Sequence, residues 1–353
     1  MVSMRGLEFY KGKRVFVTGH TGFKGSWMSR LLILAGADVT GYSLDPPTEP
    51  SLFGILGLKN EMHSIHGDVR DVECLKRAVR ENRPEIVFHL AAQPLVRESY
   101  RFPRETFETN IMGTVNLLEA LRSTGSASSI VNVTTDKVYL NREQRIGYRE
   151  EDMLDGYDPY SNSKSCSDIV THSYRESFFR EMGTAVSCAR AGNVIGGGDF
   201  AKDRIVPDCV RAAACGQTIV LRNPGSVRPF QHVLEPVSAY LKIAEKQAQD
   251  PSLAGEYNVG PDESDAVTAG ELADLFTEAW GEGSSWRSES DGGPHEAGLL
   301  LLDSGKISRV LGWKPKWTIR DAVSRTVEWS KVYMSGGDAE GCTDEQIREY
   351  CNV

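Results

Sequence analysis

The chain has 353 residues, and its 40 lysine and arginine residues against 49 aspartate and glutamate residues give a net charge of −9 at neutral pH. A chain this long buries a large core, which we expect to be divided between two lobes. The acidic excess argues against nucleic acid or an anionic membrane surface as a partner. No apolar run approaches the roughly 18 residues that are needed to span a bilayer.

The first 190 residues alternate short apolar runs with helical patterns. The runs predict strands at 14–18, 37–43, 63–67, 85–90, 129–134 and 185–190, with helices near 23–36, 71–82, 104–122 and 159–182 between them. This alternation predicts an α/β fold of the Rossmann type, a doubly wound parallel sheet with helices on both faces. We therefore assign residues 1–190 to a dinucleotide-binding domain.

After residue 190, loops rich in glycine and proline interrupt the pattern, and helices are predicted near 204–215, 233–248 and 268–280. We expect residues 191–335 to form mainly a smaller α/β substrate-binding lobe over the carboxyl edge of the sheet, with a return segment of the first domain at about 230–255. The tail, 336–353, is small and polar. Within it, Thr343 and Gln346 are predicted to cap a last short helix.

The first predicted strand leads directly into a glycine-rich turn, VTGHTGFKG, and then into a helix. Glycines at such a turn let the backbone approach a pyrophosphate, whose charge faces the helix N-terminus. The sequence therefore predicts a dinucleotide site here. Its candidate residues are Gly19, His20, Thr21, Gly22, Phe23 and Gly25.

The carboxyl ends of the following strands should line the same crevice. Ser43 ends the second strand, and Asp45 two positions later favours NAD because a carboxylate there can hold a ribose hydroxyl. Lys24 could instead support the extra phosphate of NADP, so the spacing alone leaves the choice of cofactor open. The other candidates for cofactor binding are Asp68, Val69, Leu90, Ala91, Ala92, Gln93, Asn110 and Thr134.

The segment PYSNSK places Tyr160 and Lys164 four residues apart, on one face of helix 159–182. A lysine ammonium beside a phenol lowers the pKa of the phenol, and a shift from about 10 to near 7 corresponds to roughly 4 kcal/mol. Tyr160 could then take a proton from a substrate hydroxyl while hydride passes to a nicotinamide. We expect both side chains to contact cofactor as well.

The fifth predicted strand ends in VTTDKVYL, which brings Thr135, Asp136 and Lys137 to the same edge of the sheet. In a continuing strand Asp136 and Lys137 would point to opposite faces. Their use on one substrate requires the strand to end at about Thr134, so that both side chains turn into the crevice beside Tyr160.

These motifs, together with GDVRD (67–71) and LAAQ (90–93), resemble the extended short-chain dehydrogenase/reductase family in its nucleotide-sugar branch. The segment LLLDSGKISRVLGWKP (300–315) extends the resemblance over nearly the whole chain. Thr-Asp-Lys before Val-Tyr is similar to the Thr-Asp-Glu of sugar-nucleotide 4,6-dehydratases. The lysine, GHTGFKGSW and GYSLDPPTEPSLF are most similar to those that act on CDP-glucose.

The resemblance implies an NAD-dependent lyase that oxidises C4 of the hexose, removes water across C5 and C6, and returns hydride to C6. It makes Thr135 a hydrogen-bond partner at O4 and Asp136 the acid at O6, and Lys137 falls where relatives have a glutamate base. A base must be unprotonated. We therefore hypothesise that Asp136 is neutral and Lys137 partly deprotonated in the ternary complex, because Lys164 and the nicotinamide add positive charge nearby.

A nucleotide-sugar substrate carries a diphosphate, which arginines of the second lobe would bind. The candidates on this side are Asn193, Arg204, Arg222 and Arg228. The resemblance also implies deoxysugar biosynthesis, as for lipopolysaccharide O-antigen, and a homodimer or homotetramer. The alternatives are a dehydratase for a dTDP- or GDP-hexose, a nucleotide-sugar 4-epimerase, and a nicotinamide-sensing binding protein without turnover.

The seven cysteines form no Cys-x-x-Cys pair, and the segment MVSMRGLEFYKGKR lacks the apolar core of a secretory signal. Both features favour a cytoplasmic protein with free thiols. His20, His89 and His232 show no metal-ligand spacing, and we predict no metal site.

Overall fold

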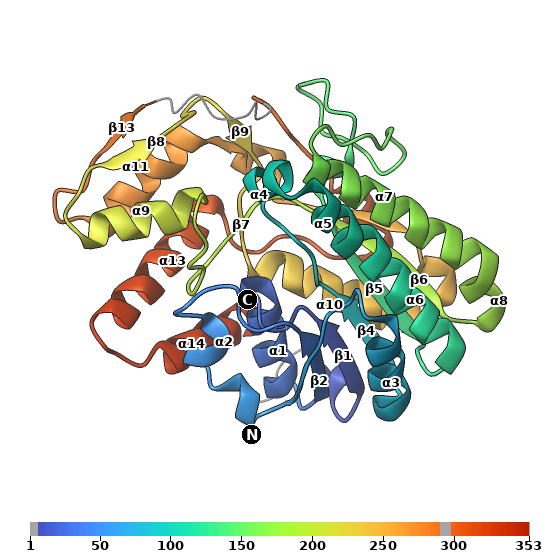
Figure 1. Ribbon diagram of the computed structural model, residues 1–353. Coiled ribbons are helices and arrows are strands. Elements are labelled where there is room, and N and C mark those ends of the chain that lie inside the picture. The colour runs from blue at the N-terminus through green and yellow to red at the C-terminus, as the bar shows by residue number, and fades with distance from the viewer. Residues whose placement is uncertain (1–5, 290–297, 353) are drawn as a thin grey trace.

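The computed structural model describes residues 6–289 and 298–352. Its centre is a sheet of seven parallel strands in the order β11-β6-β5-β4-β1-β2-β3 (Figure 1). These strands are β1 (Arg14–Thr18), β2 (Asp38–Ser43), β3 (His63–His66), β4 (Ile86–His89), β5 (Ser129–Thr135), β6 (Ala185–Ala191) and β11 (Glu256–Val259). The doubly wound fold and its six predicted strands are confirmed. The seventh strand, β11, was not predicted.

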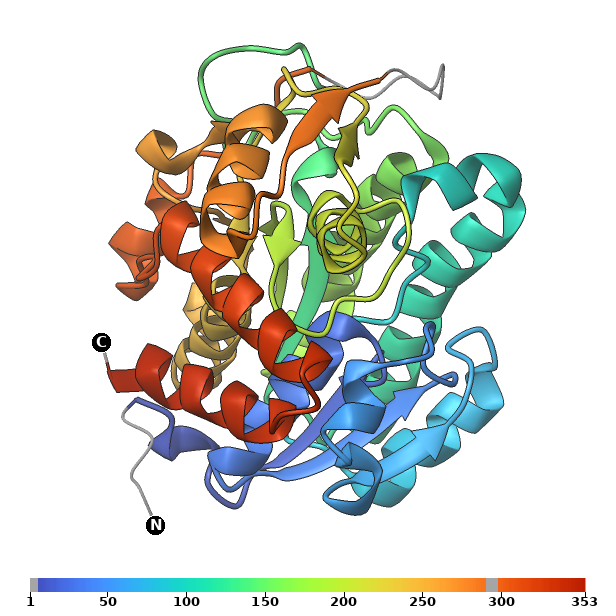
Figure 2. The same cartoon turned by 90° about the vertical axis from the view of Figure 1, so that its left-hand side faces the viewer.

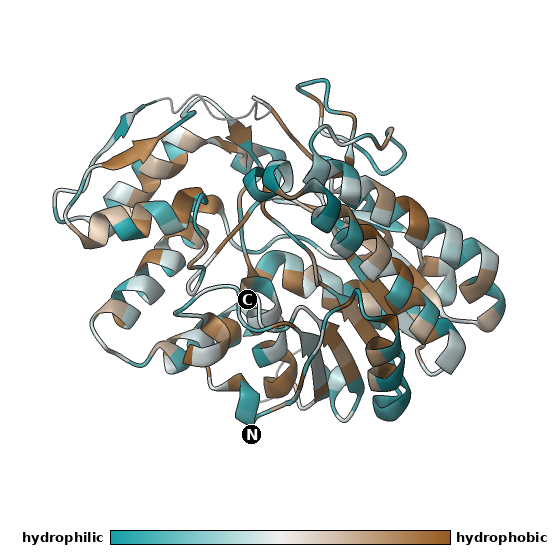
Figure 3. Ribbon diagram, viewed as in Figure 1, coloured by the Kyte–Doolittle hydropathy of each residue, from teal (hydrophilic) through white to brown (hydrophobic). Residues whose placement is uncertain are grey.

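Helices cover both faces of the sheet, because successive side chains of each strand point to opposite sides. In β1, Val15 and Val17 pack in one core cluster and Phe16 packs in the other. The first cluster includes α1 (Phe23–Leu34) and α10 (Leu234–Gln249), and the second includes α3 (Val72–Asn82), α6 (Gly113–Thr124) and α7 (Pro159–Tyr174). Figure 3 shows apolar strands flanked by helices with hydrophilic stretches.

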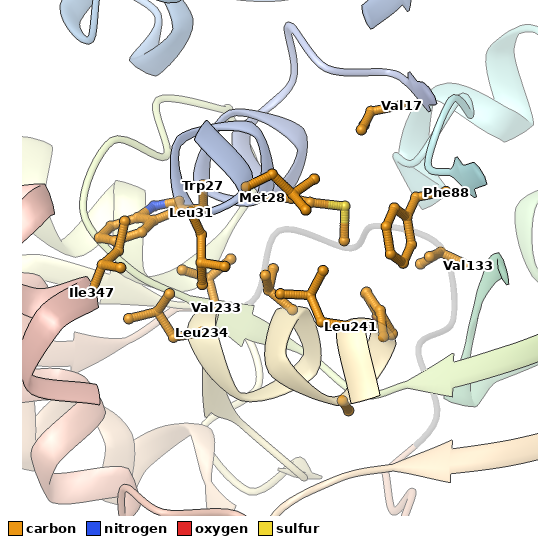
Figure 4. Packing of buried hydrophobic residues seen from close by; sticks show 14 of the residues in the cluster. Val17, Trp27, Met28, Leu31, Phe88, Val133, Val233, Leu234, Leu241 and Ile347 are labelled. Atoms are coloured by element: carbon orange, nitrogen blue, oxygen red, sulfur yellow. The ribbon is translucent and has the colours of Figure 1, made fainter. Parts of the chain in front are cut away.

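The first core cluster fixes α1 against the sheet and against α10 (Figure 4). Trp27 and Leu31 of α1 are buried together with Leu241 of α10 and with Val17 and Phe88 of the sheet. Each such side chain contributes about 1.5–3 kcal/mol on burial. This packing holds the N-terminus of α1 at the carboxyl end of β1.

The two long predicted helices are confirmed, but each contains a π-helical turn. The first comprises α5 (Pro103–Phe107), a π turn (Glu108–Met112) and α6, and the second comprises α7, a π turn (Arg175–Phe179) and α8 (Arg180–Met182). Asp158 caps α7 by accepting a hydrogen bond from the Ser161 amide, and Pro159 begins the helix. The start of α7 is therefore well defined next to β5.

Several segments after β6, but not α10 or β11, form a second lobe with a core of its own. Its cluster includes Val206 from α9 (Ile205–Ala214), Leu272 and Phe276 from α11 (Ala269–Trp280), and Val323 from α13 (Ile319–Met334). The small strand pairs there are β8 (Ile219–Leu221) with β13 (Trp286–Ser288), β9 (Val227–Arg228) with β12 (Val267–Thr268), and β7 (Val194–Ile195) with β10 (Gln231–His232). Three further helices are α2 (Leu52–Ile55), α4 (Val96–Arg101) and α12 (Gly305–Leu311).

The C-terminal tail is a long helix, α14 (Ala339–Asn352), so the expected short helix capped by Thr343 and Gln346 is wrong. Thr343 lies one turn inside the helix, where its hydroxyl accepts a hydrogen bond from Trp329 Nε1 at 2.8 Å. Gln346 donates to the Arg325 carbonyl. Although the composition of this segment is mostly polar, one face of α14 is buried and includes Ile347 and Tyr350.

Ion pairs fasten α14 to α1, and the two helices lie side by side in Figure 2. The Arg30 guanidinium donates to both Asp344 oxygens, at 2.6 and 2.9 Å, and also to Glu61 and Glu340. The C-terminal helix therefore supports the helix that follows the glycine turn. None of the helices in the described ranges is long and apolar enough to cross a membrane.

Glu235 is a buried carboxyl group that joins α10 to the C-terminal part of the chain. It accepts hydrogen bonds from the Lys316 and Trp317 amides and from the Tyr350 hydroxyl. Burial raises the pKa of Glu235 to about 7. The folded protein therefore holds a proton here between about pH 4.5 and 7 that the unfolded chain releases, and this contribution to stability is lost as the pH rises.

Replacing Glu235 with glutamine removes that titration. We expect the stability of the wild type relative to Glu235→Gln to fall by about 1.4 kcal/mol per pH unit between pH 5 and pH 7. Urea unfolding at each pH measures the difference. Glu73→Gln on the exposed side of α3 is the control, and a pH-independent difference for Glu235→Gln would contradict the prediction.

Candidate active site

A single cavity of about 1820 Å³ runs along the carboxyl edge of the sheet, between the sheet and the second lobe. It includes the glycine turn after β1, the ends of β4 and β5, the start of α7, and loops before α9 and β9. Carboxyl ends of parallel strands are where ligands bind in such folds, at the point where the strand order reverses. Here that point lies between β1 and β4.

The turn after β1 admits only glycine at two positions. Gly19 has a φ of +75°, and a Cβ there would lie 2.7 Å from the Ala91 amide nitrogen. A Cβ on Gly25 would lie 2.1 Å from the Gly19 carbonyl oxygen. At Gly22 the nearest atom would be 3.4 Å away, and this residue lines the cavity. The turn thus leaves open space in front of the N-terminus of α1. A pyrophosphate fits this space, because a helix N-terminus favours negative charge.

Ser43 and Asp45 lie beside this turn, where the ribose of a dinucleotide would be expected. The Ser43 hydroxyl is 2.8 Å from the Thr21 hydroxyl, and Asp45 is exposed, 3.4 Å from His66 Nε2. Both residues line the cavity. The same wall contains Phe23, Asp68, Val69, Leu90, Ala91, Ala92, Gln93 and Thr134.

Two of the predicted cofactor residues lie behind the wall instead. His20 is fully buried under Gly41, with its Nε2 2.8 Å from the Ser64 hydroxyl. Asn110 is also buried, and it accepts a hydrogen bond from the Gln93 amide and donates to Ser163. These residues support the turn and the loop after β4, respectively. The position of a residue in a sequence motif does not determine whether its side chain points into the cavity.

The chain turns directly after β5, one residue later than expected. The strand ends at Thr135, and a single 3-10 turn covers Asp136–Val138. Lys137 lines the cavity and donates to the Asn193 carboxamide at 3.1 Å. Asp136 is 0% exposed and lies beneath that wall, so the expectation that both side chains open into the crevice holds only for Lys137. The Asp136 carboxylate is 3.6 Å from the Lys137 amine.

Tyr160 and Lys164 extend from one face of α7 towards this turn, as predicted. Lys164 Nζ donates to the Val133 carbonyl at 3.0 Å, and burial lowers the pKa of Lys164 to about 8. Burial raises the pKa of Tyr160 to about 12, although a hydrogen bond with Thr135 and the charge of Arg204 oppose the rise. The expected lowering of the Tyr160 pKa by Lys164 is therefore not found, because loss of hydration outweighs the nearby positive charge.

A buried ion pair lies directly behind this turn. Arg190 of β6 donates to both oxygens of Asp168, which lies one helical turn after Lys164, at 2.7 and 3.0 Å. Asp168 also accepts from the Thr134 hydroxyl, and Arg190 donates to the Tyr139 hydroxyl. Thr134 and Tyr139 bracket the turn on both sides. The sequence reasoning missed this pair, although the spacing of Asp168 from Lys164 places both on one helix face.

Lys24 does not point towards the end of β2, as the NADP alternative required. Its amine donates to the Tyr240 hydroxyl of α10 at 3.2 Å and lies 5.4 Å from the ring centroid. Burial lowers the pKa of Lys24 to about 7, the charges of Lys164 and Arg204 add to this, and the charge of Asp136 opposes it. Lys24 is therefore a third amine at the reaction end of the cavity, with Lys137 and Lys164.

The four predicted substrate residues, Asn193, Arg204, Arg222 and Arg228, all line the same cavity. Arg204 donates to Asp199 at 2.9 Å, and Arg222 donates to Asp203 at 3.0 Å. Arg228 is buried and donates to the Val227 carbonyl. The structure thus places three guanidinium groups in the lining of the cavity that the glycine turn also lines.

The other two histidines singled out in the sequence lie in the interior. His89 is between the Thr18 and Thr114 hydroxyls, and the His232 ring packs edge-on against Trp27 and Trp317. In the part of the chain that the structure describes, no group of three or more potential metal ligands occurs.

The seven-stranded sheet, the glycine turn after its first strand and the Tyr160–Lys164 pair beside the end of β5 define an extended short-chain dehydrogenase/reductase. A sequence profile described as GDP-mannose 4,6-dehydratase matches residues 16–326, and the chain belongs to that family.

Two known proteins are similar to this chain over nearly its whole length. A CDP-glucose 4,6-dehydratase of Salmonella typhimurium is 48% identical over 352 residues, which cover 98% of each chain. A solved dTDP-glucose 4,6-dehydratase of Streptomyces venezuelae, with NAD bound, is 26% identical and superposes with a TM-score of 0.78, covering 92% of this chain and 98% of that one.

The position of Lys24 predicts an amine that titrates near pH 7, far below the usual range for lysine. Reductive methylation with ¹³C-formaldehyde gives each lysine a methyl resonance whose shift reports its protonation. We expect one resonance to titrate near pH 7 and to be absent from Lys24→Met. Lys59→Met, which removes an exposed lysine, is the control. A Lys24 resonance that titrates above pH 10 would contradict the prediction.

Proposed function

We propose that this protein is an NAD-dependent hydro-lyase that converts CDP-D-glucose into CDP-4-keto-6-deoxy-D-glucose and water. The observation that carries the proposal is the turn after β5: its Thr135 and Lys137 line one cavity with Tyr160 and Lys164, and Asp136 lies directly beneath that wall. It combines a pair suited to oxidation at C4 with a carboxyl group and an amine suited to elimination across C5 and C6. The relative from Salmonella typhimurium, named CDP-glucose 4,6-dehydratase, supports the choice of substrate.

The residues would act in sequence on one hexose. Burial disfavours the Tyr160 phenolate, and the positive charge of the oxidised nicotinamide would favour it. Tyr160 therefore takes the proton of the 4-hydroxyl once the cofactor is bound, with Thr135 as the hydrogen-bond partner and Lys164 supplying further positive charge. The bound dinucleotide supplies the hydride acceptor for C4 and the hydride donor for C6. The ketone at C4 makes the C5 proton acidic, so that Lys137 removes it while Asp136 protonates the departing 6-hydroxyl. Lys137 then returns the proton to C5.

NAD is the cofactor that we assign, because Asp45 stands near the end of β2 and the Streptomyces venezuelae relative was solved with NAD. The diphosphate of the substrate would lie among Arg204, Arg222 and Arg228, whose guanidinium groups suit a doubly charged ligand. Asn193 would contact the sugar from the loop after β6.

We further propose a homodimer or homotetramer in the cytoplasm. The support for an assembly is the set of exposed apolar side chains on the α5–α8 side of the molecule, which include Met112, Ile169 and Phe178. Covering such side chains on a second copy of the chain would remove apolar area from water.

Hydride tracing tests the reaction itself. With CDP-glucose that carries deuterium at C4, we expect the label at C6 of a 4-keto product, because the hydride removed from C4 is returned to C6 of the same molecule. Proton NMR and mass spectrometry of the product locate the label. Label retained at C4 in a galactose product would mean a 4-epimerase. No reaction with CDP-glucose or dTDP-glucose would refute a dehydratase.

Lys137→Met tests the base. We expect elimination and exchange of the C5 proton with solvent to fall by about 10²- to 10⁴-fold, since general-base catalysis contributes that much. Oxidation at C4 should survive, and single-turnover absorbance of the reduced nicotinamide measures it. Lys59→Met, remote from the cavity, is the control. If C5 exchange survives in Lys137→Met, the amine is not the base.

A further inference from the structure

The loop between β7 and α9 contains two aspartates, and each binds an arginine of the cavity. Asp199 accepts a hydrogen bond from Arg204 at 2.9 Å, and Asp203 accepts one from Arg222 at 3.0 Å. All four residues line the cavity. The proposed function assigns both arginines to the diphosphate of the substrate. Each carboxylate therefore contacts a group that the diphosphate also needs.

The pair of Asp199 and Arg204 is held in place by the rest of the loop. The Asp199 side chain is 5% exposed, and its other carboxylate oxygen accepts a hydrogen bond from the Ala201 amide at 3.1 Å. Arg211 of α9 donates to the carbonyl groups of Phe200 and Ala201. Separating a buried carboxylate from its partner is costly. Asp199 therefore stays with Arg204 and orients its guanidinium group.

The pair of Asp203 and Arg222 is exposed instead. The Asp203 side chain is 53% exposed and that of Arg222 is 31% exposed. Asp203 lies in a turn just before α9, and Arg222 directly follows β8, so the contact joins two loops. Ion pairs between exposed side chains contribute little to stability. This pair can therefore open while the fold stays intact.

A diphosphate at Arg222 would compete with Asp203 for the guanidinium group. Like charges that lie close together repel one another, and the half-exposed carboxylate is the group that water can solvate as it moves away. An arginine can also present two parallel N–H groups to the oxygens of a phosphate, which makes the diphosphate the stronger competitor.

We propose that Asp203 is a displaceable counter-ion that exchanges with the substrate diphosphate at Arg222. Asp203 holds the guanidinium group between turnovers, gives it up as the nucleotide sugar binds, and takes it back as the product leaves. The exchange lowers the affinity for substrate and product alike and speeds the departure of the CDP-linked product. Asp199 keeps Arg204 in place throughout. This role rests on the proposed function, which places the diphosphate at these arginines.

Asp203→Asn tests the exchange, because asparagine has nearly the same shape and tolerates the φ of +59° at this position. We expect the Kd for CDP to fall about two- to fivefold, the effect of one exposed ion pair, mainly through slower dissociation. Calorimetric titration and stopped-flow measurements with NAD present give the two quantities. Asp262→Asn, which changes an exposed aspartate outside the cavity lining, is the matched control.

Two further variants separate the exchange from simple charge repulsion. In the Arg222→Gln background, Asp203→Asn should give no gain, because the group for which carboxylate and diphosphate compete is absent. Asp199→Asn should weaken CDP binding, because Arg204 loses the carboxylate that orients it. A gain that persists without Arg222, or that Asp199→Asn also gives, would overturn the exchange.

A crystal structure of the CDP complex gives a direct readout. We expect the Arg222 guanidinium group to contact the diphosphate and to have left Asp203, and a contact retained at 3.0 Å would overturn the exchange. If the wild type converts CDP-glucose while Asp203→Asn leaves CDP binding unchanged, the exchange fails and the proposed function stands. If the wild type neither binds CDP nor converts CDP-glucose, the proposed function fails, and the exchange fails with it.

Discussion

The buried pair of Asp168 and Arg190 is the constraint on which the reaction end of this molecule depends. Taking two charges out of water is costly, and such a pair persists only when its remaining hydrogen-bond capacity is used. Here it is used by Thr134 before the turn and by Tyr139 after it. Tyr139 in turn donates to Asn258 of β11 at 2.6 Å. The pair thus connects β5, β6, α7 and β11 behind the turn, and removing one partner of a pair like this costs about 3–5 kcal/mol.

The cavity in front of that pair disfavours charge. Burial is the largest cause of the lowered pKa of Lys24, of the lowered pKa of Lys164 and of the raised pKa of Tyr160. Neutral forms are favoured for all three until a charged ligand arrives. A dinucleotide and a diphosphate bring both signs of charge with them, so ligand binding and the protonation of these groups must be coupled. The glycine turn and the three arginines line the same cavity as these groups, so both ligand charges would act on them.

The sequence predicted what depends on local pattern and failed where distant segments meet. Six strands, the glycine turn and the shared helix face of Tyr160 and Lys164 follow from periodicity and spacing. The seventh strand did not, because its four residues, EYNV, carry too short a signal without their neighbour β6. The direction of Lys137 and that of Lys24 depend on Asn193 and Tyr240, which lie far along the chain. No local pattern records such contacts.

The support of α1 by α10 and α14 also sets the order in which the protein can mature on the ribosome. Trp27 and Leu31 emerge early, whereas Leu241 and Ile347, which belong to the same core, are made much later. At about 5–20 residues per second, translation of the segment between them takes on the order of tens of seconds. Until these later segments are made, the apolar face of α1 lacks the side chains of α10 and α14 that bury it in the folded protein. Loss of the last helix by premature termination would therefore expose the interior of the nucleotide-binding half, not merely shorten the molecule.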